Sequence, residues 1–141
     1  MNGTRDLAAL LSTLEPELSG TEMVFCSFPD LGIDETCHLR PVGLFLEAEG
    51  LTLIITKAVA EQHGIPFAAT FKAITLNVHS SLEAIGLTAA VASRLTLHGI
   101  SANMIAAYYH DHIFVPAADA ERAVQVLLAL QAEASAGNGT A

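Results

Sequence analysis

The sequence predicts an α+β fold in which antiparallel strands carry helices on one face. Two observations lead to this prediction: segments that favour strands alternate with segments of helical periodicity, and residues 41–56 form two strands around a tight turn. Residues 67–133 read strand, helix, strand, strand, helix, and residues 1–66 read helix, strand, strand, strand, helix. This succession is typical of the ferredoxin-like arrangement, of βαββαβ type, with antiparallel sheets and helices on one face.

In the first half, a short helix opens the chain. Its leucines recur at every third or fourth position between residues 7 and 14, which places them on one buried face. Residues 23–28 favour a strand, and the polar stretch 29–40 favours an exposed loop. The hairpin 41–56 turns at Gly50, a residue that adopts positive φ without strain, and a short helix follows it.

The second half begins with a long strand over residues 67–78. Residues 80–83, Ser-Ser-Leu-Glu, have the spacing of a capping box, which predicts that a helix begins there and runs to about residue 98. Two further strands follow, and we expect His110 and Asp111 to form the bend between them. A last helix completes the pattern.

We expect two domains of similar size. The tripeptide His-Gly-Ile occurs at 63–65 and at 98–100, each time where a predicted helix gives way to a strand. The predicted N-terminal domain, with its leading helix, spans residues 1–66, and the predicted C-terminal domain spans residues 67–134. Residues 135–141 are Ser, Ala, Gly, Asn and Thr, and we expect them to form a disordered tail.

Net charge limits the kinds of partner that the protein can bind, and the cysteine pattern indicates its cellular compartment. Six Lys and Arg stand against fifteen Asp and Glu, so the net charge of −9 repels nucleic acid and anionic membranes. No apolar run approaches the ~20 residues that cross a bilayer. The two cysteines form no CxxC pair, which favours reduced thiols over a disulfide framework. We therefore expect a cytoplasmic protein with no nucleic-acid and no membrane partner.

The sequence contains no recognisable catalytic motif. It has no P-loop, no GxGxxG after a strand and no GxSxG, so we expect neither enzymatic activity nor a cofactor. His110 and His112 are the candidates for a metal site, because side chains two residues apart on one strand point the same way. A bend at His110 and Asp111 would remove that alignment, and no third ligand accompanies them, so we favour the bend. A metal-dependent hydrolase built on these histidines stays as the less favoured alternative.

Three motifs in the second half share a pattern with one known family: Ser-Ser-Leu-Glu-Ala-Ile-Gly-Leu at 80–87, Gly-Ile at 99–100 followed by Asn103, and Asp-His-Ile-Phe-Val-Pro at 111–116. With the residues around them, 74–116, they resemble the ACT domains, in the branch where two such domains form one short bacterial protein. A looser counterpart, Glu-Gly-Leu-Thr, lies at 49–52. The resemblance is strong over residues 74–116 and moderate over residues 16–66.

The resemblance implies a regulatory or sensing role for a non-catalytic tandem ACT protein. In this family a small ligand, usually an amino acid, binds where two domains or two subunits meet, and we expect a homodimer in which an exposed sheet edge is paired. The physiological ligand of this branch is undefined. The residues that the resemblance assigns to the ligand are Val78, His79, Ser80, Ser81, Leu82, Glu83, Ala84, Ile85, Gly86 and Asn103.

Simpler roles exist for several of these side chains. Ser80 and Glu83 could cap the helix without touching a ligand, although free N–H groups at a helix start also favour an anion. His79 could face water, and Asn103 could satisfy loop carbonyls at a chain reversal. A ligand-free module that binds a partner protein through an exposed sheet edge is therefore an alternative function.

Overall fold

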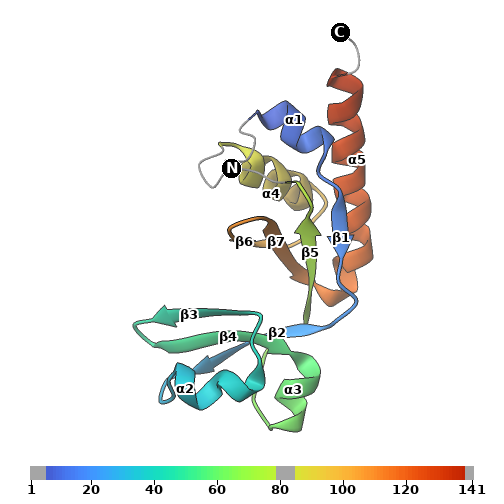
Figure 1. Ribbon diagram of the computed structural model, residues 1–141. Helices are drawn as coiled ribbons and strands as arrows, with labels where there is room; N and C mark the ends of the chain where they lie inside the picture. The colour runs from blue at the N-terminus through green and yellow to red at the C-terminus, as the bar shows by residue number, and fades with distance from the viewer. Residues whose placement is uncertain (1–5, 79–84, 139–141) are drawn as a thin grey trace. The chain divides into compact units, whose positions relative to one another are not determined.

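The computed structural model of the protein describes residues 6–78 and 85–138 (Figure 1). These residues form two compact units. The smaller unit spans residues 20–71, and the larger unit combines the described residues up to Ser19 with those from Lys72 onward. The leading helix, which we expected in the N-terminal domain, therefore belongs to the larger unit. Each unit has its own sheet pairing and its own hydrophobic core.

The smaller unit is an antiparallel sheet with short helices. Its elements are, in chain order, β2 (Met23–Phe28), α2 (Ile33–Thr36), the 3-10 helix η1 (Cys37–Leu39), β3 (Gly43–Glu47), β4 (Gly50–Thr56) and α3 (Lys57–Gln62). Strand β4 lies between β3 and β2 and is antiparallel to both. Alternate side chains of β4, at Leu51, Leu53 and Ile55, are buried in the core of this unit, as expected of a strand with one face against a core.

The β3–β4 hairpin confirms the pairing predicted for residues 41–56. Gly50 has a φ of 137°, as predicted, and a Cβ at this position would lie 2.5 Å from the Cα atom of Pro29. Glycine is therefore required here by close packing as well as by backbone conformation. The stretch 29–40 differs from the exposed loop that its polarity predicts, because it contains α2 and η1 and buries Leu39 in the core.

The larger unit places helices against four strands of the sheet (Figure 1). Its strand order is β1-β5-β7-β6, with β1 antiparallel to β5 and β6 antiparallel to β7. The elements are α1 (Leu7–Ser12), β1 (Pro16–Leu18), β5 (Phe71–Leu76), α4 (Leu87–Leu97), β6 (Asn103–Ala106), β7 (Asp111–Pro116), the 3-10 helix η2 (Ala117–Asp119) and α5 (Ala120–Asn138).

The core of the larger unit lies between the sheet and its helices. Ile74 and Leu76 of β5 are fully buried, which confirms the face predicted for this strand. They belong to one cluster with side chains from the helices and from β7. Burial of each such aliphatic side chain contributes roughly 1.5 to 3 kcal/mol. The fully buried members of the cluster from the other elements include Leu10, Val91, Leu95, Ile113, Val115 and Leu127.

Strand β1 and the end of α5 are the parts of the larger unit that the sequence analysis does not predict. The three residues of β1 pair with β5 from Pro16 opposite Leu76 to Leu18 opposite Ile74. Helix α5 continues through residues 135–138, where composition led us to expect a disordered tail. The Ser135 hydroxyl donates to the backbone carbonyl of Ser12 at 3.2 Å, so the end of α1 anchors this turn of α5.

Each helix within residues 6–78 and 85–138 is too short or too polar to cross a membrane.

Candidate functional site

The predicted ligand residues lie mainly between the end of β5 and the start of α4, in the larger unit. Val78 follows β5 and is buried in the core cluster, whereas Ile85 is 86% exposed. At the two described ends of this segment, the side chain of Val78 is therefore buried in the core and that of Ile85 lies in solvent. Six of the predicted residues lie outside the described part of the chain: His79, Ser80, Ser81, Leu82, Glu83 and Ala84.

Helix α4 begins later than the capping box predicts. Its first residue is Leu87, and its N-cap is Gly86, which has a φ of 97° and makes no side-chain capping bond. The helix start predicted at residues 80–83 lies outside the described residues; within them, the left-handed conformation of Gly86 sets the start of α4 at Leu87. A Cβ on Gly86 would lie 3.2 Å from a methyl group of Leu7, so α1 also packs closely against this helix start.

Asn103 serves the β-sheet. It is the first residue of β6, and its side-chain amide donates to the backbone carbonyl of Phe114 at 3.2 Å. Asn103 is also the residue opposite Phe114 in the β6–β7 ladder. The amide thus satisfies a backbone acceptor, which is the simpler of the two roles that the sequence suggested for it.

The β6–β7 hairpin turns two residues earlier than expected. Its loop covers residues 107–110, closed by the Ala107 amide, which donates to the His110 carbonyl at 3.0 Å. The exposed rings of Tyr108 and Tyr109 contact each other edge to face, with centroids 4.9 Å apart. The bend predicted at His110 and Asp111 is therefore wrong in register, because the two tyrosines are accommodated in the loop and Asp111 is already paired with Ala106 in the ladder.

His112 is held within the sheet. Its Nδ1 atom lies 2.9 Å from the hydroxyl oxygen of Thr75, so β7 and β5 are joined by a side-chain hydrogen bond. Burial lowers the pKa of His112 and the nearby His110 lowers it further, while Asp111 acts in the opposite direction. Within residues 6–78 and 85–138, no three His, Cys, Asp or Glu side chains come together in a geometry that could hold a metal ion.

Asp111 is largely buried, although the sequence predicted it only as part of a bend. It is 9% exposed, no hydrogen bond to its carboxylate is found among the described residues, and its oxygens keep some contact with solvent. Burial raises the pKa of this carboxyl group, against the opposing effects of His112 and His110. The sequence did contain a signal, because Asp111, Ile113 and Val115 alternate along one strand and therefore point to one face.

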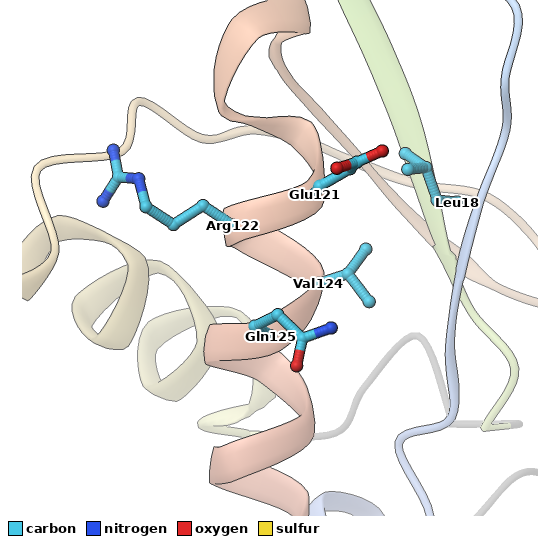
Figure 2. A pocket seen from close by; sticks show the side chains of 5 residues that line it. All are labelled: Leu18, Glu121, Arg122, Val124 and Gln125. Atoms are coloured by element: carbon cyan, nitrogen blue, oxygen red, sulfur yellow. The ribbon is translucent and has the colours of Figure 1, made fainter.

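A shallow pocket of about 330 Å³ lies between β1 and α5 of the larger unit. Figure 2 shows Glu121 and Val124 of α5 directed toward Leu18, while Arg122 points away from them. The Arg122 guanidinium donates to the carbonyl of His98 at 2.6 Å and to Asp119 at 3.2 Å. The Arg122 guanidinium is thus engaged outside the pocket, whose described lining offers the Glu121 carboxylate, the Gln125 amide and the apolar side chains of Leu18 and Val124.

A second pocket, of about 230 Å³, lies within the smaller unit at the start of α3. The Thr56 hydroxyl accepts from the Val59 amide, and the Lys57 amide donates to the Glu22 carbonyl, so the local polar backbone groups are satisfied. The helix is only six residues long. Charged side chains therefore line this pocket, but the hydrogen bonds described above are formed within the protein and are not available to a ligand.

Antiparallel strand pairs with helices packed against them define each unit as an α+β module of ferredoxin-like type. Profiles described as ACT domain match residues 2–72 and residues 69–129. The chain belongs to the ACT domain family, as a tandem of two such domains. ACT domains are regulatory, non-catalytic modules, and the chain is therefore regulatory in class.

Solved structures support the same assignment. A Vibrio cholerae protein of unknown function, described as a possible transport protein, is 46% identical, with a TM-score of 0.82, over 90% of this chain and 97% of that chain. The ligand-free regulatory subunit of aspartate kinase from Thermus thermophilus is 10% identical, with a TM-score of 0.64, over 84% and 97% of the two chains. Aspartokinase III from E. coli, in complex with aspartate and ADP, is 14% identical, with a TM-score of 0.56, over 82% of this chain and 32% of that chain. Both kinase likenesses show the fold alone, and no match was found among curated proteins.

Proposed function

We propose that the protein is a cytoplasmic sensor that binds a small metabolite, an amino acid, and passes on that signal without catalysing a reaction. The observation that carries the proposal is the match of ACT domains to both halves of the chain, residues 2–72 and 69–129. The mechanism is linkage: the ligand binds one arrangement of the protein better than another and shifts the equilibrium by no more than this difference in affinity.

We place the ligand beside the segment that joins β5 to α4. The first N–H groups of α4 have no intrahelical acceptor, and together with the helix dipole they favour a carboxylate. Glu83 would repel a carboxylate but suits an ammonium group, as in an amino acid that carries both charges. The full set of proposed contacts is the one that the resemblance implied: Val78, His79, Ser80, Ser81, Leu82, Glu83, Ala84, Ile85, Gly86 and Asn103.

We also propose a homodimer that forms through β3. Within residues 20–71 this strand pairs with β4 alone, and Phe45 and Leu46 on it are 70% and 66% exposed. Antiparallel pairing of two copies about Phe45 would place Leu44 opposite Leu46 and Glu47 opposite Gly43. Apolar residues would then face apolar residues and no two acids would be opposed, which supports self-association at this edge.

The same exposed strand favours one alternative function. An open apolar edge also suits β-augmentation by an extended segment of another protein, without any small ligand. The two functions differ in what stabilises the isolated protein, because a ligand that binds only the folded state raises its melting temperature.

A thermal-shift screen against the twenty amino acids tests the proposed function. A ligand at about 100 times its Kd adds about 2.7 kcal/mol of stability, which corresponds to roughly 5 to 10 °C for a chain of this size. We expect one amino acid, or a few related ones, to give such a shift. If none of the twenty shifts the melting temperature, the sensor function as stated is wrong and the interaction module becomes the better explanation.

A further inference from the structure

We propose that Asp111, at the start of β7, is a ligand-recognising residue whose buried carboxylate binds the ammonium group of a primary amine, with His110 as the neighbouring hydrogen-bonding group. This inference rests on the proposed amino-acid binding and deepens it, because it assigns one functional group of the ligand to a residue outside the β5–α4 segment.

Asp111 differs from the other buried polar residue of the described chain, whose side chain is hydrogen-bonded. Thr36 and Asp111 are the two buried polar or charged residues within residues 6–78 and 85–138. The Thr36 hydroxyl lies 3.0 Å from the Gly32 carbonyl and 3.2 Å from the Ile33 carbonyl. No hydrogen bond to the Asp111 carboxylate is found among the described residues, and its oxygens are not among the fully buried unpartnered atoms, so they keep some contact with solvent. A largely desolvated carboxylate that lacks a protein partner but stays accessible can accept a hydrogen bond from a ligand.

A second unpaired group belongs to the preceding residue, His110, which also acts electrostatically on the Asp111 carboxyl group. The Nδ1 atom of His110 is buried and has no hydrogen-bond partner among the described residues. His112, two residues further on, differs from it, because its Nδ1 atom is bonded to Thr75. Two consecutive residues of the hairpin, His110 and Asp111, thus carry polar side-chain groups that form no hydrogen bond with the described part of the fold.

The chemistry of these groups selects the class of ligand. A carboxylate repels anions and accepts hydrogen bonds from cations, and no group of three His, Cys, Asp or Glu among the described residues is arranged to hold a metal ion. A primary ammonium group donates three hydrogen bonds and needs no fixed coordination shell. In an amino acid, the ammonium group would then bind Asp111 in place of Glu83, and the carboxylate would accept hydrogen bonds from the first N–H groups of α4 and from an N–H on Nδ1 of His110.

The pKa of Asp111 and the net charge of the protein both favour binding of a cationic group at this residue. Burial raises the pKa of Asp111, and the two histidines that act on it lower this pKa only in part. The ionised form is therefore disfavoured in the free protein and would be stabilised by an ammonium group. The net charge of −9 also favours the approach of cationic groups over anionic ones.

Titration calorimetry on the full chain tests this inference, with the twenty amino acids and the primary amines isoamylamine, phenethylamine and cadaverine as probes. We expect Asp111→Asn to weaken the binding of each probe that the native protein binds by about 10-fold to 100-fold, since a hydrogen bond to a charged group is lost. Asp30→Asn is the matched control, because it removes the same charge from an exposed position in the smaller unit and should leave every Kd unchanged.

The outcomes separate this inference from the proposed function. If amino acids bind the native protein and Asp111→Asn equally well, the inference is overturned while the sensor function stands. If amines bind and depend on Asp111 but amino acids do not bind, the inference stands and the sensor function falls. If no probe binds the native protein, both are overturned. Should Asp111→Asn fail to fold, the ¹³C chemical shift of the Asp111 carboxyl in the native protein decides, because a bound amine must lower its pKa and an amine that leaves it unchanged contradicts the inference.

Discussion

The apolar strand β3 gives a prediction whose size can be worked from the structure. A phenylalanine side chain buries roughly 150 to 250 Å², so Phe45, which is 70% exposed, offers on the order of 100 to 170 Å² per copy to a partner. At about 25 cal/mol per Å² this is worth about 2.5 to 4 kcal/mol per copy, or about 5 to 8 kcal/mol for the two copies of a dimer. Only part of the free energy expected from buried area appears as binding free energy, so we take half of it, about 3 kcal/mol, as the contribution to dimerisation.

The substitution that tests it is Phe45→Lys. In the proposed register the two lysines would face each other, so lost burial and like-charge repulsion act together, and the Kd of the dimer should rise roughly 100-fold. Sedimentation velocity over a range of protein concentrations measures this change. Leu97→Lys is the matched control, since it charges an apolar position at the end of α4 that is also largely exposed and should leave the dimer intact. A native protein that stays monomeric, or a Phe45→Lys variant that dimerises like the native protein, would refute the reasoning.

Three further predictions concern stability and are checked by urea denaturation. Gly50→Ala should cost more than about 2 kcal/mol, because its Cβ would lie 2.5 Å from the Pro29 Cα at a φ of 137°; a cost below 1 kcal/mol, the order of an ordinary surface change, would contradict the close packing. Leu95→Ala should cost about 2 to 5 kcal/mol, because Leu95 is fully buried; Leu97→Ala, at an exposed position of the same helix, is the control and should be near neutral. Asp111→Asn should stabilise the ligand-free protein at neutral pH and have less effect in acid. Burial raises the pKa of Asp111 in the folded state, so the native protein loses stability as pH rises through that pKa and the variant does not; equal pH profiles would show that the carboxylate is not desolvated.

Local sequence signals predicted the elements that local physics determines. The β3–β4 hairpin follows from alternating apolar residues around Gly50, whose positive φ the structure confirms. The buried face of β5, with Ile74 and Leu76, follows from a period of two, and the family resemblance predicted the tandem ACT architecture. These features depend on residues close in sequence or on a strong motif.

The features that were missed depend on partners distant in sequence. Strand β1 has three residues and no periodicity of its own, and it exists through pairing with β5, far away in the chain. The capping-box pattern at residues 80–83 lies outside the described residues, and within them α4 begins at Leu87, after Gly86 in the left-handed region. Asp111 was assigned to a turn because Asp favours turns, whereas the ladder with Ala106 places it in a strand and directs it toward the core. Its burial could not be read from its residue type, which is rarely buried without a partner.

Binding of an amino acid by the isolated chain is the central claim, and isothermal titration calorimetry with each of the twenty amino acids tests it most directly. We predict saturable binding of one amino acid or of a few chemically related ones, and weaker binding of the same compound to Asp111→Asn than to Asp30→Asn. Absence of saturable heat for all twenty amino acids, with protein that is folded by circular dichroism, would contradict the claim that this tandem ACT protein is an amino-acid sensor.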